Sequence, residues 1–224
     1  LEKNMLGLYL TGHPINQYLD ELTRFITGRL DTLTDKAESA AAAAGGGFVR
    51  GTPAVVAGLC VAERTMRTQS GDKQLFITLD DGRGRGEMRL VGDDIEVLAD
   101  RVGRDQLVIV EGDVSFDSFN GNLRIRHKRL YTLGEARARF AQCVTIALTP
   151  DCGIEATERL LDVVEPFREA EGLPVIVEVE SELGRGAFRL GDEWRVAPEA
   201  TLMERLGELD TVTRAAAYYP GRVH

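Results

Sequence analysis

Apolar side chains recur with two different periods along the chain. A helical spacing comes first, behind a proline at position 14 that suits the first turn of a helix. The residues at this spacing are Ile15, Tyr18, Leu19 and Leu22. Residues 1–36 are therefore assigned to a helical segment of a preceding domain. Residues 37–50 pass from a run of alanines into three glycines and are interpreted as a flexible linker.

Residues 51–131 alternate with a period of two and predict five strands. The strands are centred on "AVVAGLCVA", "QLFITLDD", "GRGRGEMRLV", "QLVIVEGDVSF" and "NLRIRHKRLY". A single helix, "DDIEVLADRV", is expected between the third strand and the fourth. This order is that of an OB-fold barrel. The segment "GRGRGE" is interpreted as a hairpin turn, because the helix that a dinucleotide fingerprint requires does not follow it.

Residues 132–224 mix both periods and predict a small α+β domain. Strands are expected at "CVTIALT" and "LPVIVEVES", and a hairpin from "GAFRL" to "EWRVA". Helices are expected at residues 154–164 and from Pro198 to about Leu209. The predicted fold class is thus mostly β plus α+β: a five-stranded OB-fold barrel, then a small α+β C-terminal domain, with an N-terminal helical segment.

Charge is distributed unevenly along the chain, whose formal net charge is -9. Residues 132–224 carry 17 acidic and 10 basic side chains. This net negative charge makes them poorly suited to bind a phosphate backbone. The fifth strand of the barrel is different, because Arg124, Arg126 and Lys128 share the face opposite Leu123 and Ile125. This pattern predicts a cationic outer face that lies along nucleic acid.

Further cations and aromatic side chains extend this predicted surface. Arg83 stands among several other basic residues around the first three strands, where an OB-fold usually meets its ligand. Phe119 lies at the predicted hairpin tip and is the better stacking candidate, whereas Phe76, in an apolar run, is expected in the core. The candidate nucleic-acid-binding residues are Arg64, Arg67, Lys73, Arg85, Arg89, Phe119, Arg124, Arg126 and Lys128. Binding is expected to be weak and strongly dependent on salt.

No arrangement of residues indicates catalysis, a metal site or a cofactor in this chain. Cys60, Cys143 and Cys152 have no C-x-x-C spacing and are interpreted as reduced thiols of a cytoplasmic protein. The adjacent aspartates at 80–81 and 93–94 are assigned to a turn and to a helix start. The histidines at positions 13 and 127 are assigned structural roles or none. The sequence has neither a signal-peptide pattern nor an apolar run long enough to cross a bilayer.

Two motifs carry a resemblance to a known family. "YLTGHP" at residues 9–14 and "VSFDSFNGNLR" at residues 114–124 closely resemble the C-terminal part of the bacterial DNA polymerase III alpha subunit, and the resemblance covers essentially the whole chain. It implies a piece of a replisome protein, a DNA-directed DNA polymerase (nucleotidyltransferase), whose catalytic carboxylates lie far upstream. It also implies that the barrel contacts single-stranded template DNA. The last domain would bind the tau subunit of the clamp-loader complex, and the motif for the sliding clamp would lie upstream.

Three residues depart from the family pattern. Gln69 stands where a lysine is common, Gly86 replaces a strand-favouring apolar residue, and Val91 stands where an aromatic residue is common. Gly86 is expected to let the third strand bulge or pair poorly. Two other functions stay open at this point. One is a protein-binding module whose barrel is only a spacer, and the other is an independent nucleotide-handling enzyme.

Overall fold

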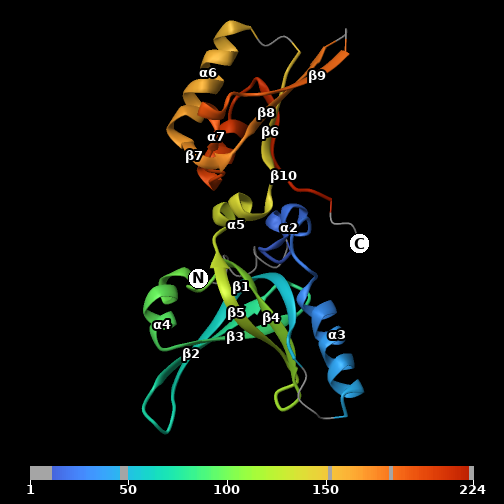
Figure 1. Ribbon diagram of the computed structural model, residues 1–224, viewed down its shortest axis with the longest axis vertical. Coiled ribbons are helices and arrows are strands. Elements are labelled where there is room, and N and C mark those ends of the chain that lie inside the picture. The colour runs from blue at the N-terminus through green and yellow to red at the C-terminus, as the bar shows by residue number, and fades with distance from the viewer. Residues whose placement is uncertain (1–11, 46–49, 151–152, 182–183, 222–224) are drawn as a thin grey trace. The chain divides into compact units, whose positions relative to one another are not determined.

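The structure is a computed structural model that describes residues 12–45, 50–150, 153–181 and 184–221 (Figure 1). Part of the "YLTGHP" motif and Cys152 lie outside the described residues. The chain divides after Thr132 into two compact units. We call them the barrel unit, up to Thr132, and the sheet unit, from Leu133 onward.

The barrel unit is built on five strands that close into a barrel in the order β1-β2-β3-β5-β4. The strands are β1 (Thr52–Arg67), β2 (Lys73–Asp80), β3 (Arg85–Val91), β4 (Leu107–Asp117) and β5 (Asn122–Tyr131). Only β3 and β5 pair in parallel, and the other four pairings are antiparallel. The predicted five-stranded OB-fold barrel is confirmed.

Side chains that alternate along β2, β3 and the first half of β5 fill much of the barrel interior. In β2 the buried side chains are Leu75, Ile77 and Leu79, and in β5 the buried Leu123 and Ile125 lie on either side of the exposed Arg124. The expectation that Gly86 disturbs β3 is wrong, because β3 pairs with β2 in an unbroken register. A Cβ atom at Gly86 would lie 2.7 Å from the Cδ1 atom of Ile125, so the glycine makes room for that side chain in the core.

The pairing of β4 with β5 contains a bulge at Gly112. Glu111 pairs with Arg129 and Gly112 pairs with His127, so Lys128 is the additional residue on β5. A Cβ atom at Gly112 would overlap the carbonyl group of Arg126. Only glycine therefore fits this position without moving the neighbouring strand.

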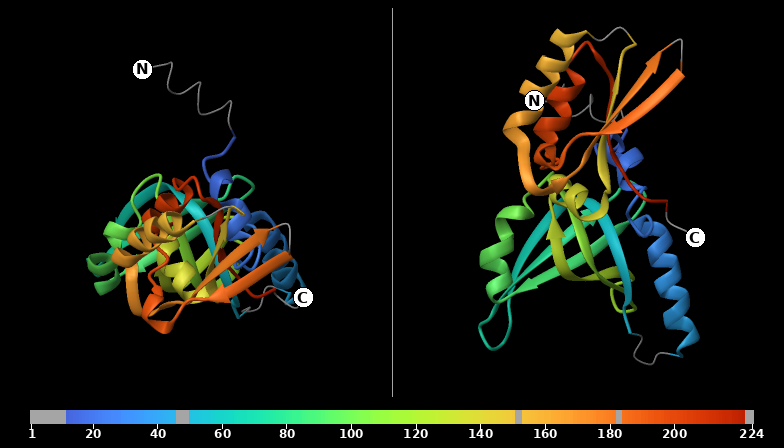
Figure 2. Two further views of the ribbon diagram at one scale, coloured as in Figure 1. Left: turned by 90° about the horizontal axis from the view of Figure 1, so that it is seen from above. Right: turned by 45° about the horizontal axis from the view of Figure 1, so that its top comes forward.

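Helices surround the barrel (Figure 2). They are α2 (Asn16–Leu22), α3 (Leu30–Ala43), α4 (Asp93–Leu98) and the 3-10 turn η1 (Ala99–Arg101). The assignment of residues 37–43 to a flexible linker is wrong, because these residues continue α3. Leu30 and Leu33 of α3 are buried with the barrel core and Ala37 packs against it, while alanine is the strongest helix former.

The sheet unit contains a four-stranded sheet in the order β10-β6-β8-β9. Its strands are β6 (Cys143–Leu148), β7 (Arg168–Leu173), β8 (Val175–Ser181), β9 (Gly184–Arg189) and β10 (Val212–Tyr218), of which β7 lies outside the sheet. Its helices are α5 (Leu133–Phe140), α6 (Ile154–Val164) and α7 (Ala200–Gly207), with 3-10 turns η2 (Glu165–Phe167) and η3 (Asp192–Trp194). Leu160, Leu202 and Leu206 from α6 and α7 form one core with β6 and β8.

The predicted hairpin from "GAFRL" to "EWRVA" is wrong. β9 instead pairs antiparallel with β8, which precedes it directly. Trp194 belongs to a 3-10 turn, where the guanidinium carbon of Arg168 lies 4.9 Å from the centroid of its ring. Val196 forms single bridges to Arg168 and Leu173. The second segment of the expected hairpin thus packs against β7 and leaves β9 free to extend the sheet.

Candidate nucleic-acid interface

A row of three side chains crosses the outer face of β1, β2 and β3. Arg64 pairs with Phe76, and Phe76 pairs with Arg89. We call this set the Arg–Phe–Arg row. The expectation that Phe76 lies in the core is wrong, since the buried residues of β2 are its neighbours Leu75 and Ile77 and the Phe76 side chain is only half-buried on the opposite face.

The two arginines of this row differ in their surroundings. The guanidinium carbon of Arg64 lies 4.9 Å from the centroid of the Phe76 ring, and its Nη2 lies 3.6 Å from a carboxylate oxygen of Glu87. The Arg64 side chain is 63% exposed, so the cation–π contact is worth about 0.5–1 kcal/mol. Arg89 is exposed and has no ion-pair partner among the described residues. Its charge is therefore available to a ligand.

Apolar and acidic residues lie on either side of the Arg–Phe–Arg row. Toward the tip of the β1–β2 hairpin, Met66, Gln74 and Val91 form the next row, and Met66 and Val91 are 46% and 41% exposed. On the other side, Thr78 pairs with Glu87. One end of this face is hence apolar and cationic, while the other carries carboxylates.

The predicted cations of the β1–β2 hairpin do not all share this face. Arg67 pairs with Lys73, and both have the parity of Leu75, so they project from the opposite face of the hairpin. Arg67 donates to the carbonyl oxygen of Gly71 at 3.3 Å. Arg85 shares the outer face, but its Nε lies 2.7 Å from a carboxylate oxygen of Asp80. Only part of the predicted cationic surface is therefore brought together.

The β5 cations are exposed, but two of them form ion pairs with acidic residues of the barrel. Arg124 forms an ion pair with Asp117, and Nζ of Lys128 lies 2.7 Å from Oδ1 of Asp113. Burial would raise the pKa of Asp117, but hydrogen bonds from Arg124 and from the turn outweigh it and lower that pKa. Arg126 pairs across from Asp113 in the sheet but forms no ion pair among the described residues. A phosphate would have to displace a carboxylate to reach Arg124 or Lys128.

Phe119, the predicted stacking residue, lies at the tip of the β4–β5 hairpin. Phe119 is 94% exposed, and its backbone N–H donates to Oδ1 of Asp117 at 3.1 Å. Phe116 is half-buried in β4. Sequence parity could have distinguished these aromatic residues, because Phe76 shares its face with the polar residues Gln74 and Thr78.

The remaining titratable residues have structural partners. Asp81 and Asp80 organise the β2–β3 turn, and the Nε2 atom of His127 lies 3.2 Å from Asp94. Cys60 and Cys143 are free, buried thiols, and burial with help from Glu63 raises the pKa of Cys60 to about 11. Among the described residues, no group of three or more histidine, cysteine or acidic side chains is placed to hold a metal ion. None of the described helices is long and apolar enough to cross a membrane.

Comparisons with known proteins agree on the barrel and on a family. Residues 54–133 match a model described as an OB-fold nucleic acid binding domain. The chain is 37% identical over 209 residues to the DNA polymerase III subunit alpha of Vibrio cholerae, and 36% identical over 207 residues to that of Escherichia coli K12. These matches cover 93% and 92% of the chain. The chain is homologous to the C-terminal region of the DNA polymerase III alpha subunit.

The chain spans 17% of the length of these two alpha-subunit relatives. Solved structures that match part of this chain include RecG bound to a three-way DNA junction, with a TM-score of 0.32, 19% identity and coverage of 37% of this chain and 11% of that one. The second single-stranded DNA-binding protein of Mycobacterium smegmatis matches with a TM-score of 0.33 and 13% identity, over 39% of this chain and 93% of that one.

Proposed function

We propose that this chain is a non-catalytic part of a replicative DNA polymerase. Its barrel unit binds single-stranded template DNA, and its sheet unit docks a protein of the replisome. The longer protein is a DNA-directed DNA polymerase, a nucleotidyltransferase, whose catalytic carboxylates lie outside this chain. The homology to alpha subunits supports this proposal, as does the match of residues 54–133 to a nucleic-acid-binding OB-fold.

The observation that carries DNA binding is a closed barrel with exposed cations that form no ion pair among the described residues. Arg89 and Arg126 lie on its outer face, whereas Lys73 projects from the opposite face at the end of the β1–β2 hairpin. Lys73, Arg89 and Arg126 are exposed and have no carboxylate partner in the described part of the chain. Each cation that reaches a phosphate releases counterions, so affinity falls steeply with salt. With three such contacts, affinity for a single strand should fall about 20-fold between 50 and 200 mM salt.

Fluorescence anisotropy tests this proposal with the 224-residue chain and a labelled single strand of about 15 nucleotides, a length within the range of one OB-fold. We expect weak binding with a salt slope of about -2. The double variant R89Q/R126Q should flatten that slope by more than half. An undetectable signal at the lowest salt would refute DNA binding by the barrel.

For the sheet unit we propose docking to the tau subunit of the clamp-loader complex. The family resemblance and the excess of acidic side chains in residues 132–224 support a protein partner rather than DNA. The sliding clamp would bind to a motif upstream of this chain. A pull-down of the tau C-terminal region with the 224-residue chain tests the docking. Retention that residues 1–132 cannot compete away would support it, and no retention would refute it.

The second candidate function is a protein-binding module with the barrel as a spacer. The ion pairs of Arg124 with Asp117 and of Lys128 with Asp113 favour it, because they neutralise part of the predicted surface without DNA. Exposed ion pairs contribute only about 0–1 kcal/mol each, so a phosphate can compete for these cations. The salt series separates the two functions, since a spacer gives no response.

A further inference from the structure

The geometry points to Phe76 as the stacking position for an unpaired base, with Arg64 and Arg89 holding the phosphates on either side of it. This inference rests on the proposed binding of single-stranded DNA and adds the place and the chemical basis of that binding. The ligand is a strand with at least one unpaired nucleobase, and the sugar–phosphate backbone alone does not satisfy the site.

The position of Phe76 is the first observation. Leu75, Ile77 and Leu79 fill the core from the other face of β2, so the barrel does not need an aromatic ring at residue 76. The ring instead lies on the outer face, next to Thr78 and Gln74. A half-exposed ring in the middle of a strand provides a rigid flat surface on which any base can stack.

The neighbours of Phe76 are the second observation. Its partners across β1 and β3 are both arginines, so a base on the ring has a cation on each side. Arg64 now covers the ring and makes a long, exposed contact with Glu87. Stacking of a base on an aromatic ring is generally stronger than an exposed cation–π contact, so the base takes the ring and the guanidinium turns to a phosphate.

The charge pattern of the face sets the path of the strand. Asp80 and Glu87 lie at one end of the outer face, and both would repel a phosphate chain. Met66 and Val91 lie at the other end and offer apolar surface to a second base. The strand therefore crosses β1, β2 and β3 on the hairpin side of the Arg–Phe–Arg row. A duplex presents no free base face and gains only the phosphate contacts.

Binding of two matched ligands tests the inference. One is a labelled dT oligonucleotide of about 15 nucleotides, and the other is a strand of equal length built from abasic sites. We expect the wild-type chain to bind the dT strand about tenfold more tightly than the abasic strand at equal salt. F76L should weaken binding of the dT strand to the level of the abasic strand and leave the affinity for the abasic strand unchanged. F76Y should keep the tenfold difference. F188L alters an exposed phenylalanine of β9 in the sheet unit, provides the matched control and should leave the ratio unchanged. F119L tests the tip of the β4–β5 hairpin as the competing stacking position.

The outcomes separate this inference from the proposed function. Equal wild-type affinity for both strands, or a ratio that F76L leaves intact, would overturn the role of Phe76 while DNA binding stands. Loss of the ratio in F119L but not in F76L would move the stacking position to the β4–β5 hairpin and also overturn it. Failure to bind either strand would overturn both proposals. Thermal unfolding of F76L and F76Y confirms that the variants remain folded.

Discussion

An ion pair between Arg29 and Asp81 connects the start of helix α3 to the β2–β3 turn. The Nε atom of Arg29 donates to the Asp81 carboxylate at 2.8 Å, and the Leu30 backbone N–H donates to the same oxygen at 2.8 Å. The other carboxylate oxygen accepts from the backbone N–H groups of Arg83 and Gly84. Asp81 is 1% exposed, so one buried carboxylate holds together a turn of the barrel and the start of a helix.

Replacing Asp81 by asparagine should destabilise the barrel unit by about 2–4 kcal/mol, because it leaves the partly buried Arg29 cation without its counter-charge. Urea unfolding followed by far-ultraviolet circular dichroism measures the loss. The single tryptophan, Trp194, reports the sheet unit, which has its own core, and its fluorescence midpoint should not move. The control D20N alters an exposed aspartate of α2 and should change neither signal.

The same pair predicts a dependence of stability on pH. Burial alone would raise the pKa of Asp81, but hydrogen bonds from Arg29, Leu30, Gly84 and Arg83 outweigh it and lower that pKa below its ordinary value of 3.8. The unfolded chain binds this proton first on acidification, so stabilisation by Asp81 is complete near neutral pH and is lost as the pH falls through and below 3.8. The difference in unfolding free energy between wild type and D81N should shrink from pH 7 to pH 3. A constant difference would contradict the lowered pKa.

The bulge at Gly112 predicts a position that tolerates no side chain. G112A should cost about 1–3 kcal/mol, because its Cβ atom would overlap the carbonyl group of Arg126 and push β4 away from β5. The matched control is G186A in β9, where an added Cβ meets no atom within 4 Å. Urea unfolding of both variants should show a loss only for G112A, and equal losses would contradict the close approach.

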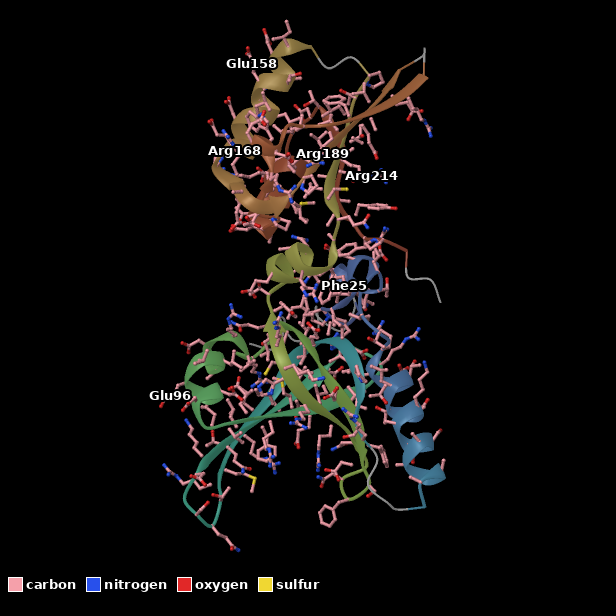
Figure 3. The ribbon with its side chains drawn as sticks, in the orientation of Figure 1. Phe25, Glu96, Glu158, Arg168, Arg189 and Arg214 are labelled. Atoms are coloured by element: carbon pink, nitrogen blue, oxygen red, sulfur yellow. The ribbon has the colours of Figure 1, made fainter. Side chains whose placement is uncertain are left out.

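The acidic partners of β5 predict a gain of DNA binding. D117N and D113N should each raise affinity for single-stranded DNA about two- to fivefold at low salt, because each releases a cation for a phosphate. E96Q removes the same charge from α4, where Glu96 extends away from the barrel (Figure 3), and serves as the control. A gain equal to that of E96Q would show that only overall charge matters and that β5 makes no direct contact.

Burial of Cys60 predicts slow chemical modification. Its thiol is fully buried, and its pKa of about 11 leaves little thiolate at pH 8. Iodoacetamide should therefore label the Cys60 peptide at least about tenfold more slowly in the folded chain than in guanidinium, as followed by mass spectrometry. Equal rates would show that β1 opens readily.

Alternation of apolar residues was sufficient to predict β2, β3 and β5, because each of these strands buries mainly one face. β1 and β4 contain longer apolar runs, since residues 56–60 and 108–110 are buried consecutively. The helix between β3 and β4 was predicted from its helical spacing. The alternation rule applied to single residues would have placed Phe76 correctly. The apolar run "LFI" led to a core assignment, but Phe76 shares its parity with Gln74, Thr78 and Asp80. Hydrophobicity alone was a weaker guide than position within the strand.

Other features depended on segments that are distant in the sequence. The linker assignment failed because the barrel core that packs against Leu30 and Leu33 comes from strands far along the chain. The partners of Arg124 and Lys128 depend on the register of β4 against β5, which the Gly112 bulge shifts by one residue. The expected hairpin in the sheet unit failed because local pairing of β9 with β8 competed with it.

Closure of the barrel has a consequence for the speed of folding. The β1–β2 and β4–β5 hairpins are local, whereas β1 must also find β4, with Val56 opposite Val110, and β3 must find β5. Barrels with such distant pairings typically fold in milliseconds to seconds. The hairpin that carries Arg64 and Phe76 can therefore form well before the barrel closes. A newly synthesised chain would expose these two side chains before the barrel unit reaches its full stability.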